Sequence, residues 1–189
     1  TGLKNGANYS FSIVASNANG TSDAVITAPM KPQKPWKRLV VDQNSDAKHV
    51  TSITFNKMPL LAYTDIKSGF LKIAMWKAKK WRKVTVDGGG GSSGRTRSAI
   101  TGPISLCVNG SGSNQTLHIF YSESEDRDLH YAMYNGKKFT YEIVDGNGTV
   151  VNDYKDPVRV RTGSDVSISN ACVATAGGVQ VFYRDESQG

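Results

Sequence analysis

Three tyrosine–acid pairs recur along the 189-residue chain. Each pair is a tyrosine with an acid two positions later: Tyr63 and Asp65, Tyr121 and Glu123, and Tyr183 and Asp185. A ring of such acids on one face of a repeat protein could bind cations or sugar hydroxyls. The alternative is that each acid caps the turn that follows its strand. We expect a structural role for the tyrosines, because a tyrosine ring packs between sheets while its hydroxyl forms a hydrogen bond.

A second repeated position carries an aromatic side chain, Trp76 in one copy and Tyr134 in the other. Exposed aromatic rings can serve as platforms for sugar rings, and packing within the sheets is the alternative. The ligand-binding candidates are therefore Asp65, Glu123, Asp185, Trp76 and Tyr134.

Motifs for catalysis, metal binding or cofactor binding are absent from the sequence. His49, His118 and His130 show no triad or metal-ligand spacing, and no serine-nucleophile or HExxH motif occurs. The loops after Asp87 and Asp145 lack the regular acidic ladder of calcium loops. We therefore predict a chain that is not an enzyme, with no catalytic residue, metal site or cofactor.

Two cysteines, Cys107 and Cys172, are too few for a zinc site. They occupy equivalent positions in the first strands of two successive repeats, where Thr54 stands in the first copy. Because these strands are expected to splay apart, we predict no disulfide between them.

The formal net charge is +7, which permits a polyanionic partner. No nucleic-acid motif accompanies the basic clusters, so we expect them on solvent-facing strands and a linker, and we expect no nucleic-acid partner. No apolar run approaches the roughly 18 residues of a membrane helix, so no membrane span is expected.

One stretch of the chain is written twice, as "LKIAMWKAKKWRKVTVDGGG" from residue 71 and "LHYAMYNGKKFTYEIVDGNG" from residue 129. Residues 60–88 and 118–146 align without gaps and are identical at nine of twenty-nine positions. A third copy begins with residues 179–189, and residues 36–42 echo the last strand of a copy. Each full copy predicts four short antiparallel strands, in the first copy residues 52–55, 60–64, 70–76 and 81–86. Four strands per repeat at this period are typical of a β-propeller blade.

These repeats predict a partial β-propeller over residues 36–189. Its expected parts are an outer strand 36–42, a blade 50–88, a blade 104–146 and a partial blade 166–189. Closed propellers need more blades, so we expect the chain to be a fragment of a longer protein.

Residues 1–29 predict strands of a different kind. Tyr9, Phe11 and Ile13 alternate with smaller residues, and Leu3 lies six residues before Tyr9. With Ala15, Asn17, Gly20 and Ser22, this pattern resembles the C-terminal part of a fibronectin type III domain. The resemblance implies a partial β-sandwich in which the Tyr9 hydroxyl bonds back to the backbone upstream. Residues 30–35 follow as a proline-containing linker. The predicted fold class is therefore all-β.

The repeats in turn resemble a family of bacterial extracellular propeller repeats. The matching residues are Ser105-Leu106, His118-Ile119-Phe120-Tyr121 with Glu123, Leu129 to Tyr134, and Phe139 with Val144-Asp145. The repeats also resemble propeller lectins, which bind sugars between or atop blades. The resemblance implies a non-catalytic binding or adhesion module of a larger secreted or cell-surface protein, with a glycan or a cell-surface protein as partner. The alternatives are a structural spacer and an accessory region of an extracellular glycan-processing enzyme.

Overall fold

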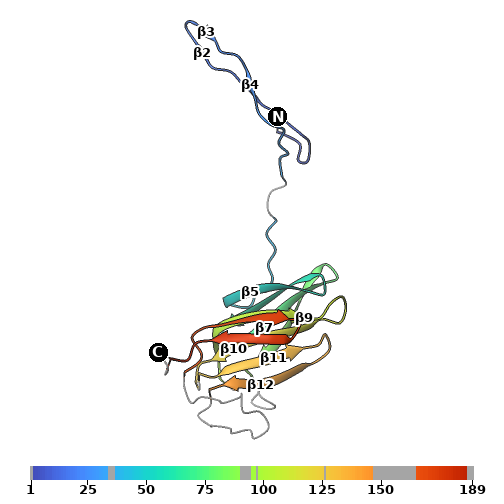
Figure 1. The fold of residues 1–189 in the computed structure, drawn as a ribbon, viewed down its shortest axis with the longest axis vertical. Helices are drawn as coiled ribbons and strands as arrows, with labels where there is room; N and C mark the ends of the chain where they lie inside the picture. Colours follow the sequence, from blue (N-terminus) through green and yellow to red (C-terminus); the bar gives the residue numbers. More distant parts are fainter. Residues whose placement is uncertain are drawn as a thin grey trace. The chain divides into compact units, whose positions relative to one another are not determined.

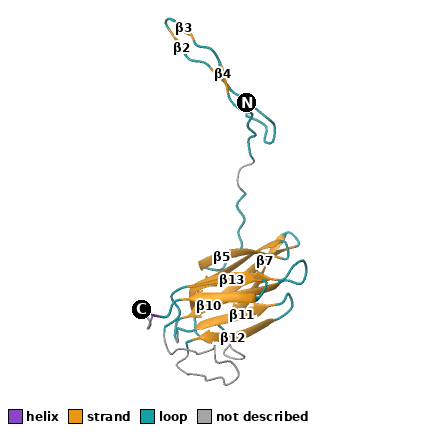
Figure 2. Cartoon of the chain, viewed as in Figure 1, coloured by secondary structure: helices purple, strands orange, loops and turns teal. Residues whose placement is uncertain are grey.

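The computed structural model describes residues 2–33, 37–89, 95–96, 98–125, 127–146 and 165–186. These residues form antiparallel β-strands and contain no α-helix, so the predicted all-β class is confirmed (Figures 1 and 2). The chain divides into two compact units, Thr1–Val40 and Val41–Gly189, which are described separately.

The first unit is a long β-hairpin. Its strands are β1 (Ser12–Ile13), β2 (Ser16–Asn17), β3 (Gly20–Thr21) and β4 (Val25–Ile26). β1 pairs with β4 and β2 with β3, and an isolated bridge joins Tyr9 to Met30. The backbone NH of Lys4 donates a hydrogen bond of 2.8 Å to the Tyr9 hydroxyl, which ties the tyrosine back to the preceding segment. Ile13 and Ile26 remain 60% and 70% exposed, so this hairpin has no core of its own.

The second unit contains two four-stranded sheets and a two-stranded hairpin. The first sheet has the order β5 (Ala47–Phe55), β6 (Met58–Asp65), β7 (Phe70–Lys77) and β8 (Lys80–Asp87). The second has the order β9 (Ile100–Asn109), β10 (Thr116–Glu123), β11 (Leu129–Tyr134) and β12 (Phe139–Asp145). The hairpin pairs β13 (Asn170–Thr175) with β14 (Gly178–Tyr183). Each sheet is a simple up-and-down meander (Figure 1).

The repetition seen in the sequence extends to the pairing register. β7 and β8 shift register between Leu71 and Lys72, and β11 and β12 shift at the equivalent Leu129 and His130. The expected strands of the first copy all form, each longer than predicted by between one and five residues. Residues 37–42 form no strand, in contrast to the expected outer strand 36–42, because their backbone pairs with none of β5 to β14.

Two layers of apolar side chains hold the sheets of this unit together. The larger layer lies between the first and second sheets and includes the fully buried Leu71, Ile73, Ile119 and Tyr121. The smaller layer lies between the second sheet and the β13–β14 hairpin and is centred on Phe120. Neighbouring residues of β10 therefore enter different layers, as the alternation of side chains along a strand requires.

A hydrogen bond between successive repeats accompanies each of these contacts. The hydroxyl of Tyr121 in β10 donates to Asp87 Oδ2 at the end of β8, at 2.6 Å. The hydroxyl of Tyr183 in β14 donates in the same way to Asp145 Oδ2 at the end of β12, at 2.7 Å. Tyr63 in β6 donates to Asp42 Oδ2 at 2.9 Å, so Asp42 takes the place of a preceding repeat's last residue. The repeated tyrosines therefore have the structural role that the sequence predicts.

Glycine follows the aspartate in both full repeats for a steric reason. Gly88 and Gly146 have φ angles of 107° and 106°, which side-chain-bearing residues rarely adopt. A Cβ at Gly88 would lie 2.7 Å from the Gly69 carbonyl oxygen, and one at Gly146 would collide with Asp128. The backbone NH of each glycine also donates to the preceding aspartate, at 2.7 Å and 2.8 Å.

The two cysteines correct an expectation, because Cys107 and Cys172 form a disulfide. β9 and β13 pack as neighbours, as β5 and β9 do, so the first strands of successive repeats converge instead of splaying apart. Their Cα atoms are 6.0 Å apart, within the range that a disulfide can bridge. The bridge joins residues 65 positions apart and connects the second sheet to the β13–β14 hairpin.

The hydroxyl of Tyr121 is expected to stabilise this unit measurably. Replacing Tyr121 by Phe leaves the buried Asp87 carboxylate without one donor, so the free energy of unfolding should fall by about 1–3 kcal/mol. Urea denaturation measures this change. The matched control is Tyr183→Phe, which should cost about 1 kcal/mol or less because Tyr183 is 39% exposed. Equal losses in both variants would contradict the importance of burial.

The disulfide can be tested by peptide mapping without reductant. A linked peptide pair that contains Cys107 and Cys172 is the expected product. Reductant should lower the free energy of unfolding by about 2–4 kcal/mol, because the open chain gains conformational entropy. A variant with both cysteines replaced by serine should be insensitive to reductant. Two free thiols under native, oxidising conditions would contradict the bridge.

Candidate functional site

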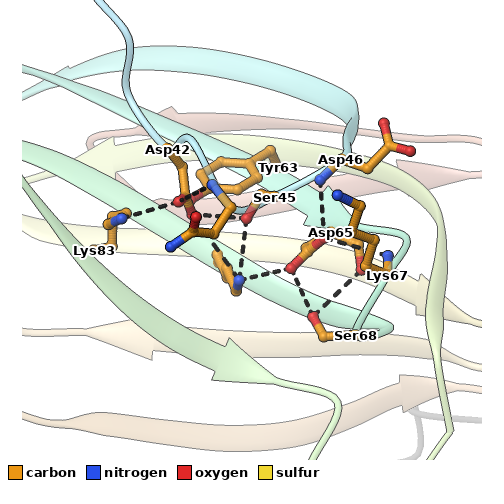
Figure 3. Close-up of polar contacts among 10 residues, drawn as sticks. Asp42, Ser45, Asp46, Tyr63, Asp65, Lys67, Ser68 and Lys83 are labelled. Atoms are coloured by element: carbon orange, nitrogen blue, oxygen red, sulfur yellow. Dashed lines mark hydrogen bonds and ion pairs between the residues drawn. The ribbon is translucent and has the colours of Figure 1, made fainter.

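Asp65 lies at the turn that follows β6, and groups of that turn donate hydrogen bonds to its carboxylate. The backbone NH groups of Asp46 and Lys67 donate to Asp65 Oδ1 at 3.1 Å and 3.3 Å. Ser68 Oγ and Lys72 Nζ donate to Oδ2 at 2.8 Å and 2.7 Å. Only 2% of the residue is exposed, so the carboxylate faces protein groups in the geometry of a turn cap (Figure 3).

Asp42 belongs to the same polar network. It accepts from Tyr63, from Ser45 Oγ at 2.7 Å and from Lys83 Nζ at 2.9 Å. Lys72 Nζ donates to Ser45 Oγ at 3.1 Å and thereby connects the surroundings of Asp42 with those of Asp65. Two carboxylates and two ammonium groups are thus joined by short hydrogen bonds beside the first sheet.

The network strongly favours the charged carboxylates. Burial alone would raise the pKa of Asp42, but hydrogen bonds from Ser45, Lys83 and Tyr63 outweigh it and hold that pKa well below its usual range. Burial likewise opposes ionisation of Asp65, but hydrogen bonds from Lys72, Ser68 and the Asp46 backbone NH, together with the charge of Lys72, outweigh it and hold that pKa well below its usual range. Burial, together with the neighbouring Asp42 carboxylate, raises the pKa of the Tyr63 hydroxyl well above its ordinary value.

These pKa shifts make the network a poor catalytic site. Carboxylates with such low pKa values are weak bases, so neither would activate a nucleophile. Lys72 Nζ is committed to the ion pair with Asp65 at 2.7 Å, so Ser45 has no free amine beside it to act as a base. The geometry is that of a structural network.

The other two candidate acids occupy equivalent places. Glu123 is 2% exposed, and its side chain accepts from the backbone NH groups of Glu125 at 2.8 Å and Asp128 at 3.4 Å. Asp185 follows β14 and is half-buried. Asp65 and Glu123 thus bond to their own turns, and a ligand-binding role for the three acids stays a prediction.

The two candidate aromatic residues line a single cleft, although they belong to different repeats. Trp76 near the end of β7 and Tyr134 at the end of β11 both border a cavity of about 290 Å³ between the first and second sheets. The cleft lies at the end of the strands that carries the hairpin turns after β5, β7 and β11, which we call the turn end. The candidate acids lie at the opposite end of the strands. The other lining residues are Phe55, Asn56, Met58, Pro59, Leu60, Met75, Lys77, Arg82 and Gly136.

Cross-strand partners hold both aromatic rings in place. Trp76 pairs with Trp81 across β7 and β8, and their rings meet edge to face at 5.3 Å. Tyr134 pairs with Phe139 across β11 and β12, and these rings stack at 4.6 Å. The Tyr134 ring also lies 6.1 Å from Phe55 of the first sheet, so it contacts both repeats. Such pairs keep a binding surface rigid before a ligand arrives.

The cleft combines an apolar floor with a cationic wall. Phe55 and Leu60 are almost fully buried beneath it, while Met58 is 38% exposed. Arg82 lies opposite Met75 in the β7–β8 register, and its side chain is exposed. This arrangement suits a small ring-shaped group that has an apolar face and polar substituents.

Sequence reasoning identified the two aromatic positions and missed the other lining residues. Met58 and Met75 lie on separate strands, and only the register brings each of them next to the cleft. The recurrence of a methionine at Met75 and Met133 was the one available signal, because it marks a repeated position one residue before the aromatic side chain.

The histidines form no recognisable site. Nδ1 of His118 lies 2.6 Å from the Tyr131 hydroxyl, and burial lowers the pKa of His118. Within the described ranges, no group of three or more His, Cys, Asp or Glu side chains is placed to hold a metal ion. Those ranges also contain no helix with the length and apolar character needed to cross a membrane.

Comparison with known proteins adds no further assignment: no protein-family model, no curated protein and no solved structure matches this chain.

Acid is expected to destabilise the unit through Asp42 and Asp65. Because their pKa values are lower in the folded than in the unfolded chain, their contribution to stability is complete above about pH 4 and is lost as pH falls further. Urea denaturation between pH 7 and pH 2.5 should show the free energy of unfolding falling below about pH 4. Asp42→Asn should be less stable at neutral pH and show a shallower decline. A decline as steep as that of the unchanged chain would contradict the role of Asp42.

Proposed function

We propose that the chain is part of a larger secreted or cell-surface protein and that residues 41–189 bind glycans without catalysing a reaction. The observation that carries this proposal is the cleft between the two sheets, with Trp76 and Tyr134 on its border and an apolar floor. Sugar rings have apolar CH faces that pack on aromatic side chains, while their hydroxyls take hydrogen bonds from the rim.

The proposed fold for this unit is an incomplete β-propeller. Successive four-stranded meanders pack face to face, and β5, β9 and β13 are neighbours, as the innermost strands of adjacent blades would be. For residues 1–29 the proposal is the C-terminal part of a fibronectin type III domain. The bond between the Lys4 backbone and the Tyr9 hydroxyl supports it, since that family closes a corner with such a bond.

The disulfide supports the proposed location outside the cell. Disulfides persist in oxidising compartments and are rare in the reducing cytosol. The bridge between Cys107 and Cys172 joins two structural elements that share only a small apolar layer. A stabilising cross-link at this position is therefore consistent with secretion.

A glycan array tests the binding function. The chain should bind at least one class of glycan, and Trp76→Ala or Tyr134→Ala should weaken binding by about tenfold, or about 1.4 kcal/mol. The matched control is Tyr134→Phe, which keeps the ring at the cleft and removes only the hydroxyl, whose bond goes to the Gly136 carbonyl. Its affinity should stay close to that of the unchanged chain.

Three outcomes would contradict the proposal. Binding to no glycan would leave the structural spacer as the better account. Binding that is indifferent to both alanine variants would exclude the cleft as the site. Release of soluble sugar from any bound glycan would show that the chain is catalytic.

A further inference from the structure

The hairpin turns after β5, β7 and β11 carry basic side chains and no acids. The strand order brings the turns after β5, β7, β9, β11 and β13 to the same end of their strands (Figure 1). The cationic residues at this end are Lys57, Lys77, Lys79, Lys80, Arg82, Lys137 and Lys138. No aspartate or glutamate occurs in the turn segments 55–60, 75–82, 108–117, 133–140 and 174–180, all of which the structure describes.

Most acids among the described residues of this unit lie at the opposite end, and Glu142 lies in the middle of β12. Asp42, Asp65, Asp87, Glu123 and Asp145 all lie at that opposite end, where they bond to tyrosines, lysines and turn backbone. The ion pairs among the described residues also lie at that end, so none of them neutralises the cations of the turn end. The charges are therefore separated along the strand direction, with an uncompensated positive surface around the cleft.

Several of these lysines stand where the fold itself does not favour them. Lys57 and Lys79 have φ angles of 62° and 61° as the second residues of two-residue turns, a position that glycine fills with less strain. Lys77 and Lys80 face each other directly in the β7–β8 register, where like charges repel. Folding does not explain these choices, whereas an anionic ligand above the turns would.

We infer that the cleft binds an acidic polysaccharide, one whose sugar rings carry carboxylate or sulfate groups. This inference rests on the proposed glycan-binding function and specifies its ligand. Trp76 and Tyr134 pack on a sugar ring, and Arg82 on the wall of the same cleft binds its anionic group, because a guanidinium donates two parallel hydrogen bonds to a carboxylate or sulfate. The surrounding lysines contact the acidic groups of neighbouring sugars in the polymer.

A single-stranded nucleic acid has a related chemistry, since its bases stack on aromatic rings and its phosphates bind lysine and arginine. The disulfide favours the polysaccharide, because the oxidising surroundings in which it persists are those of extracellular glycans. The cleft also holds its two aromatic rings within a cavity of about 290 Å³, which suits one sugar ring better than a run of stacked bases.

The test measures binding of the full chain to three probes at low ionic strength. Polygalacturonate is the acidic polymer, its fully methyl-esterified form is the neutral polymer with the same backbone, and oligo-deoxythymidine is the nucleic acid. The unchanged chain should bind polygalacturonate about tenfold or more tightly than the ester, and rising salt should weaken that binding. Heparin serves as a second, sulfated probe and should bind in the same way.

Two variants assign the effect to the cleft and its rim. Arg82→Gln and Lys79→Gly should each weaken binding to the acidic polymer severalfold, and each should weaken binding to the ester by a smaller factor. Lys79→Gly should not lower the unfolding temperature, because glycine relieves the positive φ angle. Lys67→Gln is the matched control, since Lys67 is an exposed lysine at the opposite end of the strands and should bind as the unchanged chain does.

The outcomes separate this inference from the function on which it rests. Equal affinity for polygalacturonate, heparin and the ester overturns the acidic ligand and leaves glycan binding intact. Tighter binding to oligo-deoxythymidine than to every polysaccharide overturns it in favour of a nucleic acid. Binding to none of these polymers or to any arrayed glycan overturns both proposals. An equal loss of affinity in Lys67→Gln and Lys79→Gly also overturns the inference, because it would show attraction by net charge alone.

Discussion

The hydrogen bond from a tyrosine hydroxyl to the aspartate of the preceding repeat is the interaction on which the second unit depends. In the buried pair of Tyr121 and Asp87, both partners are shielded from water, and a carboxylate without donors would be costly there. Each repeat therefore supplies a group that its neighbour needs. This mutual dependence explains why the tyrosine and the Asp-Gly pair recur together.

The two ends of the strands differ in the side chains that they carry. At one end the carboxylates accept hydrogen bonds from tyrosines, serines, lysines and turn backbone, as Asp65 and Asp42 illustrate. The opposite end is left with short turns, aromatic side chains and lysines, and it carries the cleft between the first and second sheets. In the proposed binding module, aspartates such as Asp87 and Asp145 form hydrogen bonds between repeats, and the turn end binds the ligand. Of the ligand-binding candidates named from the sequence, Asp65 and Glu123 bond to their own turns, whereas Trp76 and Tyr134 border the cleft.

Much of the fold could be predicted from the sequence because its signals are local. Alternating apolar residues are a property of short segments, so the strands of residues 60–88 were predictable. The disulfide was not, since the convergence of β9 and β13 depends on how two separate repeats pack. The expected strand 36–42 failed for a similar reason. Its sequence matches a fourth strand, yet a strand also requires a neighbour to pair with, and this segment has none among β5 to β14.

The sequence by itself determined the repeat, the class of secondary structure and the positions of its tyrosines, acids and aromatic residues, because identical short patterns specify identical local structures. Only the tertiary structure decided what those positions do. The carboxylates of Asp65 and Glu123 accept hydrogen bonds from nearby backbone NH groups, because a buried charge requires hydrogen-bond donors. The tertiary structure also brought Trp76, Tyr134 and Arg82 from different strands to one cleft, because the packing of two sheets and not the order of the chain sets which side chains meet.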